Sequence, residues 1–435
     1  MSGIVIIDAL ILVVLLVIGV PVPFCFSAAV IFLVAAGDFP SATFLIPAGF
    51  GKISSVVILA IPLYILAGGI MSQGGIAVRL VDLADSIFGR VRGGMGVVVV
   101  VATAIFGAIS GMASSAVAAI GTIMIPRMVE LGYDRAYAAS LVACSSVLAL
   151  MIPPSAAMIL YGWVTSTSIA ACFLAPVIPG FILIILFSFW NFVLTRHMPL
   201  KTPEKTSFKV AFREVRVQAR RAALGLTMPL IILGCIYGGV TTPTEAAAIA
   251  AVYAIPICLF VYKDLNFKSL YEVIWKTGQT TGVLMVLIFF AAMLARLFTM
   301  ENVPQGVLEA FITLTENKII LLLMVNVFLL LIGMFMEDVS GILLAAPMLM
   351  PIMVTLDVHP VHFAAIVSTN LGMGLITPPT APILYFGALI GNVALPKMLK
   401  PTLVFVVFGY LPVVLLTTFI PALSLTLPRL VLGIE

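Results

Sequence analysis

Two adjacent prolines interrupt a strongly apolar part of the chain, in the stretch from Asn370 to Pro382, which reads NLGMGLITPPTAP. Proline has no backbone N–H and its ring clashes with the preceding turn, so a helix entering this stretch must stop near Pro378. Gly372 and Gly374 relax the backbone just before the break. Backbone without helical partners is tolerated at membrane depth only inside protein or beside a cavity. The stretch therefore predicts a broken helix whose carbonyl, Thr and Asn oxygens can hold a small hard cation such as Na⁺.

The same break occurs a second time, earlier in the chain. Leu150 to Ala156 reads LMIPPSA and Leu375 to Ala381 reads LITPPTA, and the residue numbers 150 and 375 differ by 225. The same offset pairs Pro126 with Pro351 without a gap. Apolar identities are common between membrane segments, but aligned Pro-Pro pairs are not a product of composition. The sequence therefore predicts an internal duplication.

Polar residues also interrupt an apolar run ahead of each break. Residues 110 to 115 read SGMASS, and residues 335 to 340, at the same offset, read FMEDVS. Each interruption leaves pieces near the lower limit for crossing a bilayer, roughly 17 residues, which predicts two re-entrant hairpins with polar tips. Two hairpins and two broken helices that converge are expected of a secondary transporter built from repeats. Hydropathy does not count the crossings between the copies, so it leaves open whether they are inverted.

Composition supports a membrane protein. Of the 435 residues, 63% are hydrophobic and 9% are charged, which is far from the composition of soluble globular domains. The net charge of +4 arises largely from residues 196 to 221, where basic residues such as Arg213, Arg216 and Arg220 gather. The positive-inside rule makes this segment a cytoplasmic connector. Nothing in the sequence supports nucleic-acid binding.

These observations predict an all-α polytopic membrane protein in three parts. The first repeat half covers residues 1–195, with a hairpin near 94–128 and a broken helix near 136–165; the basic cytoplasmic connector covers 196–222; the second repeat half covers 223–435, with a hairpin near 319–354 and a broken helix near 361–390.

The cation ligands are expected among hydroxyl, amide and backbone oxygens at the breaks and hairpin tips. The predicted residues are Ser110, Ser114 and Ser155 in the first copy and Ser340, Asn370, Gly372, Gly374 and Thr377 in the second. Neutral oxygens suffice for Na⁺ and avoid a fixed charge in the bilayer. The alternative is that these hydroxyls only hydrogen-bond between packed helices.

The substrate site is predicted at Ser115, Ser155, Asp338 and Thr380. Asp338 is a carboxylate at a hairpin tip in apolar surroundings, and an intramembrane acid suggests a role with the cation or in gating. The alternative is a tip that opens to water and carries the charge without function. No Arg lies inside either motif, so hydroxyls and helix N-termini at the other three residues are the predicted contacts for an anion.

Four motifs together resemble the large membrane subunit of tripartite ATP-independent periplasmic (TRAP) transporters, over essentially the whole chain. They are GAISG at 107–111 with Ser114 and Ser115, IPPS at 152–155, TPTEAA at 242–247, and NLG at 370–372 with TPP at 377–379. Each motif alone is weak, but the set is specific.

The resemblance implies sodium-coupled uptake of an organic acid, such as a sialic acid or a C4-dicarboxylate, across a bacterial inner membrane, with two or more Na⁺ ions expected. It implies two partners, a periplasmic substrate-binding protein and a separate small membrane subunit of about four helices. It also implies two inverted repeats divided into a scaffold and a transport domain that moves as an elevator, and no enzymatic activity.

Three alternative classes remain to be weighed. A stand-alone Na⁺- or H⁺-coupled carboxylate carrier would use similar repeats without partners. An ion channel would show a continuous polar pore ring, which two proline-broken sites do not suggest. A membrane enzyme would need a catalytic constellation, and the three histidines and five scattered cysteines do not supply one.

Overall fold

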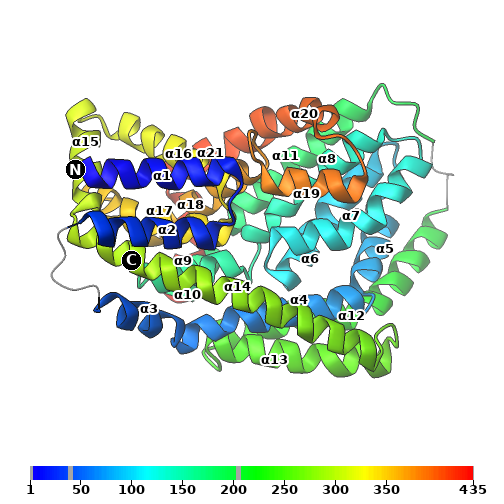
Figure 1. Ribbon diagram of the computed structural model, residues 1–435. Helices are drawn as coiled ribbons and strands as arrows, with labels where there is room; N and C mark the ends of the chain where they lie inside the picture. Colours follow the sequence, from blue (N-terminus) through cyan, green and yellow to red (C-terminus); the bar gives the residue numbers. More distant parts are fainter. Residues whose placement is uncertain (1–2, 38–42, 202–206, 435) are drawn as a thin grey trace.

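The computed structural model describes residues 3–37, 43–201 and 207–434, and within these residues it contains helices and turns but no strand (Figure 1). Eight helical stretches of the described residues are long and apolar enough to cross a membrane. They are Val56–Gln73, Ile169–Thr195, Lys209–Tyr237, Pro243–Val261, Phe267–Met300, Lys318–Phe335, Asp338–Thr355 and Leu395–Phe419. The chain is therefore an all-α, multi-pass membrane protein, as predicted.

Helices before the connector are short and end at Gly or Pro residues in several places. They are α1 (Gly3–Ile18), α2 (Val22–Ala36), α3 (Leu45–Ile53), η1 (Val56–Leu59), α4 (Ala60–Gln73), α5 (Ile76–Phe88), α6 (Gly94–Ser110), α7 (Ala113–Glu130), α8 (Arg135–Ser146), η2 (Val147–Leu150), α9 (Ala156–Val164), α10 (Ile169–Leu174) and α11 (Val177–Thr195).

The remaining helices include two long ones, α12 and α14. They are α12 (Phe208–Tyr237), α13 (Pro243–Pro256), η3 (Ile257–Val261), α14 (Phe267–Met300), α15 (Val303–Leu314), α16 (Lys318–Phe335), α17 (Asp338–Thr355), α18 (Pro360–Leu375), α19 (Pro382–Gly391), α20 (Leu395–Val404), η4 (Phe405–Tyr410), α21 (Leu411–Phe419) and α22 (Ala422–Leu432).

Helix boundaries recur at the offset found in the sequence. Helix α6 ends at Ser110 and α16 ends at Phe335, while α7 begins at Ala113 and α17 begins at Asp338. Helices α6 and α7 pack against each other, as do α16 and α17, so each pair forms a helical hairpin. The predicted hairpins and proline-broken helices are therefore present in both copies.

No helix boundary coincides with the predicted end of the connector. Helix α12 runs without interruption from Phe208 to Tyr237, so residue 222 lies inside a helix. Lys and Arg are good helix formers, and the basic segment therefore continues directly into the apolar one. The next helix, α13, begins with the capping box that its sequence suggests, since Thr242 and Glu245 bond each other's backbone N–H.

Candidate functional site

Both proline pairs break their helices in the same way. In the first copy α8 and η2 end at Leu150, and α9 begins at Ala156 after Pro153 and Pro154. In the second copy α18 ends at Leu375 and α19 begins at Pro382. Each break is thus a short non-helical segment between two helices, and both Pro-Pro peptide bonds are cis.

Four buried oxygen atoms near the breaks lack a hydrogen-bond partner. They are Ser145 Oγ and Ser155 Oγ in the first copy, and Asn370 Oδ1 and Thr380 Oγ1 in the second. Each atom in the first copy has its counterpart 225 residues later, since 145 corresponds to 370 and 155 to 380. An unpaired buried oxygen costs free energy, on the order of 1–3 kcal/mol. Unpaired oxygens thus recur at two pairs of equivalent positions in the two copies.

The amide of Asn370 belongs to a buried polar network. Its Nδ2 donates to Asn326 Oδ1 at 3.1 Å and to the Ile366 carbonyl at 2.8 Å. Asn326 in turn donates to Thr418 Oγ1 at 3.0 Å. The network links α16, α18 and α21 and fixes the Asn370 side chain, so that its free oxygen has a defined position.

Each hairpin approaches its own break closely through small residues. A Cβ atom at Gly107 would lie 2.6 Å from the Ala149 Cα, and one at Gly374 would lie 2.5 Å from the Gly333 carbonyl carbon. Beside the first tip, the Ala156 amide donates to the Gly111 carbonyl at 3.2 Å. The hairpin and the broken helix therefore form one packed unit in each copy.

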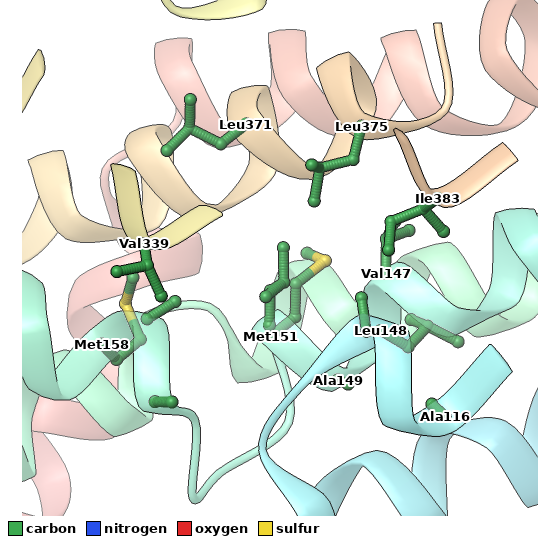
Figure 2. Close-up of a cluster of buried hydrophobic side chains, with 14 of the residues drawn as sticks. Ala116, Val147, Leu148, Ala149, Met151, Met158, Val339, Leu371, Leu375 and Ile383 are labelled. Atoms are coloured by element: carbon green, nitrogen blue, oxygen red, sulfur yellow. The ribbon is translucent and has the colours of Figure 1, made fainter. Parts of the chain in front are cut away.

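The two copies also contact each other across the breaks. Ser368 Oγ of α18 donates to the Leu150 carbonyl at 3.1 Å. Figure 2 shows the apolar side chains that fill the space around this contact, with Met151 from the first break facing Leu371 and Leu375 from the second. The breaks of both copies thus share one apolar core.

A cavity of about 370 Å³ lies at the two hairpin tips. It is lined by Ser114 and Ser115 of α7 and by Glu337 and Asp338 of the second tip. Helices α4 and α14 form the opposite wall, and Lys276 of α14 is the one basic residue among the lining residues described. The cavity therefore offers hydroxyl groups, a cation and two carboxylates to a small polar solute.

The predicted substrate residues are brought together in part. Ser115 and Asp338 line the cavity, while Ser155 is buried behind the first tip, next to the lining residue Ala156. Thr380 is not among the lining residues. Ser114, predicted as a cation ligand, is exposed in the same cavity.

The predicted cation ligands occupy more than one place. Ser110 is buried at the first tip, and Ser340 Oγ donates to the Glu337 carbonyl at 3.0 Å. Thr377 Oγ1 donates to the Met373 carbonyl at 2.6 Å, so this hydroxyl closes its own helix end. The remaining three lie on α18, where their directions differ.

Asn370 and Gly374 face α16, through Asn326 and Gly333 respectively. Gly372 faces the other way, because a Cβ atom there would meet the Tyr410 hydroxyl and the Leu150 side chain. Residues two apart on a helix do not share a face. The Cβ positions of Gly372 and Gly374 therefore lie on different faces of α18.

Three residues at the site were missed by the sequence analysis. Ser145 could have been found, because it is the counterpart of Asn370 at the offset of 225. Asn326 gave a weaker signal as a lone amide in the apolar run of α16. Lys276 lies on a helix outside both motifs, and no sequence pattern connects it with the hairpin tips.

Comparison with known proteins identifies the family. Residues 9–423 match the model for the tripartite ATP-independent periplasmic transporter, DctM component. The chain is 37% identical over 372 residues to the C4-dicarboxylate TRAP transporter large permease protein DctM of Pseudomonas aeruginosa, covering 86% of each chain. It is 32% identical to the sialic acid TRAP transporter large permease protein SiaM of Vibrio cholerae, covering 88% of each.

A third relative is longer than this chain. The isethionate TRAP transporter permease protein DctMQ of Oleidesulfovibrio alaskensis is 36% identical over 411 residues, which cover 94% of this chain and 64% of the relative. Among solved structures, the Alcanivorax borkumensis YdaH transporter has a TM-score of 0.61 at 17% identity, covering 86% of this chain and 87% of the other, and thus shares the fold. The sequence relatives are named as transport permeases rather than enzymes. The chain therefore belongs to the DctM component family of tripartite ATP-independent periplasmic transporters.

Proposed function

We propose that this chain is the permease of a sodium-coupled system that takes up a small organic acid delivered by a periplasmic binding protein. The observation that carries the proposal is the set of four unpartnered oxygens at equivalent positions of the two breaks. Sodium is a hard cation that binds neutral oxygen ligands, and broken helices in transporters commonly supply them. Two related sets of oxygens agree with at least two coupling ions.

The first set consists of Ser145 and Ser155, and the second of Asn370 and Thr380. All four side chains are neutral. An ion bound at either break would therefore add a charge that none of these four side chains neutralises. Binding of Na⁺ beside a substrate anion lowers the cost of carrying that anion through the bilayer. The coupling of the two fluxes follows from this mutual stabilisation.

The cavity at the hairpin tips is the proposed binding place of the organic acid. Lys276 offers a charged donor to a carboxylate, and Ser114 and Ser115 offer hydroxyl donors. Asp338 and Glu337 line the same cavity and favour a substrate with hydroxyl or amide donors in addition to its carboxylate. Of the relatives, one is named for sialic acid, which carries hydroxyl and amide donors besides its carboxylate, and another for C4-dicarboxylates, which carry a second carboxylate.

Alternating access is proposed to arise from movement between two parts. The hairpins and broken helices form one packed unit, and α4 and α14 form the wall opposite the tips. Sliding of the first part along the second, as an elevator between two inverted halves joined by the basic connector, would carry the cavity across the membrane. A small membrane subunit is expected to brace the second part in the bacterial inner membrane.

Sodium binding can be tested on the purified chain before any transport assay. A ligand held a hundredfold above its dissociation constant raises the free energy of unfolding by about 2.7 kcal/mol. We expect the unfolding temperature to rise with NaCl and not with equal KCl or N-methylglucamine chloride. Replacing both Ser155 and Asn370 by Ala should remove the sodium-specific part. Equal shifts with all three salts would contradict the proposal.

A further inference from the structure

A second cavity, of about 250 Å³, lies farther along α14. Its lining includes two basic residues, Lys52 of α3 and Arg296 of α14, together with Trp163 of α9. Among the described lining residues there is no acidic side chain, and small residues such as Ala292 and Ala295 leave room beside the two cations. The cavity is therefore electrostatically suited to an anion.

The two cations have no acidic partner within the described part of the chain. The ion pairs found there join other residues, on α5, α7, α12 and the turns after α5 and before α14. Lys52 Nζ lies 4.7 Å from the centre of the Trp163 ring, and Trp163 Nε1 donates to Ser55 Oγ at 3.2 Å. The aromatic face thus holds Lys52 beside the cavity without neutralising it.

The second cavity continues the path of the first. Three helices line both: α9 through Ala156 and then Trp163, α14 through Leu284 and then Ile288, and α17 through Val339 and then Leu343. No lining residue is shared, and the lining residues are shifted by four positions, about one helical turn, on α14 and α17. Figure 2 shows Val339 beside Met158 of α9 at this level.

The second cavity also lies on the side of the membrane opposite the basic connector. The turn before α14 is tied to the connector side, because Tyr262 Oη donates to the Arg221 carbonyl at 2.8 Å. Helix α14 has 34 residues and extends along most of the molecule (Figure 1). At 1.5 Å per residue this is about 51 Å, enough to cross the bilayer. Arg296, near its far end, therefore lies on the side from which an imported substrate arrives.

We propose that Lys52, Arg296 and Trp163 form an outer binding site for the carboxylate or sulfonate group of the organic anion. Arg296 can hold such a group with two parallel hydrogen bonds, and Lys52 adds a charged donor. The anion bound there lies about one helical turn along α14 and α17 from the cavity at the hairpin tips. The place of this site on an import path rests on the proposed function, whereas the binding itself needs neither sodium nor the partners.

Trp163 provides a direct probe, because a bound anion draws Lys52 away from its ring. The chain has three tryptophans, so Trp190→Phe with Trp275→Phe leaves Trp163 as the single reporter. The full-length protein is titrated in sodium-free buffer with the choline salts of succinate, isethionate and N-acetylneuraminate, and with succinamide as an uncharged control. We expect a saturable fluorescence change with at least one anion and none with succinamide.

Two substitutions then locate the binding. Arg296→Gln and Lys52→Gln should each weaken the apparent affinity about tenfold or more, as expected for loss of a charge-assisted hydrogen bond. Arg296→Lys should weaken the apparent affinity less, and Arg220→Gln on the exposed connector should leave it unchanged. Lys52 and Arg296 are both exposed, and thermal unfolding checks that their variants are folded.

Three results would overturn the proposal. The first is no saturable change in Trp163 fluorescence with any of the three anions, and the second is unchanged affinity in both glutamine variants. The third is a defect of the glutamine variants that appears only when the periplasmic protein is added. The third result would mean that Lys52 and Arg296 contact the periplasmic protein rather than the anion. Absence of sodium coupling in transport would refute the proposed function and leave this site intact.

Discussion

The two proline breaks share a backbone register but differ in their polar surroundings. At the first break, the hydroxyls of Ser145 and Ser155 are buried without partners. At the second, Asn370 is held by Asn326, which also bonds Thr418. Duplication has preserved where the helices stop, because prolines enforce that locally, while the side chains that surround each break have diverged.

If the two breaks bind Na⁺ as proposed, this difference makes the two ion sites unequal in strength. A ligand oxygen that a network already holds in place loses little freedom when an ion binds. The second break is therefore expected to bind Na⁺ more tightly than the first, where small hydroxyls have no supporting amide.

Asn370→Ala should have the largest effect on sodium-driven uptake. It removes one candidate ligand and one of the two hydrogen-bond partners of Asn326, so a fall of about 10- to 100-fold is expected. The matched change in the first copy, Ser145→Ala, should cost about tenfold or less. The sodium concentration for half-maximal uptake measures both, and an equal effect in the two variants would remove the distinction between the breaks.

Asp338→Asn should have the next largest effect. The equivalent position in the first copy is Ala113, so the substitution removes one of the two carboxylates, Glu337 and Asp338, that distinguish the second hairpin tip from the first. We expect sodium-dependent uptake to fall about tenfold, because the carboxylate faces the cavity at the tips. If both the rate and its sodium dependence were unaltered, Asp338 would have no place in the site.

Replacement of a closely packed glycine at the breaks should be about equally destabilising in both copies. Gly107→Ala and Gly374→Ala each place a methyl group within 2.6 Å of neighbouring backbone atoms. A loss of about 1–3 kcal/mol in the free energy of unfolding is expected for such overpacking. Gly278→Ala is the control, since no atom lies within 4 Å of its new methyl group. Thermal unfolding in detergent compares the three variants. If either Gly107→Ala or Gly374→Ala were as stable as the control, the close packing of hairpin and broken helix would be contradicted.

The smallest effect is expected at the connector. Arg90 pairs with Glu214 of α12 at 2.9 Å, but both side chains reach solvent. Arg90→Gln should change the free energy of unfolding by less than about 1 kcal/mol and leave uptake unchanged. A large loss of uptake would mean that the connector takes part in transport.

The sequence predicted the fold well where local chemistry decides it. Proline pairs stop helices whatever surrounds them, so the breaks at 153–154 and 378–379 and the hairpin tips were predicted close to their observed ends. The end of the connector was harder to predict. Residue 222 marks a change of composition, and the helix passes through it because both sides favour helix.

The candidate site was predicted only in part, because tertiary packing assembles it. Lys276, Lys52 and Arg296 lie on helices outside the repeated motifs, and only the fold brings them to the cavities. The opposite directions of Asn370 and Gly372 could have been predicted, since helical periodicity separates residues two apart. Ser145 could likewise have been found by applying the offset to every polar residue.

Uptake of labelled organic acids into proteoliposomes that hold this chain and the proposed small membrane subunit is the decisive measurement. It is made with and without an inward sodium gradient, and with and without the periplasmic binding protein. We predict uptake only when both are present, with a half-maximal sodium concentration that rises in the Asn370→Ala variant. Uptake that proceeds equally well without sodium would contradict sodium coupling at the two breaks.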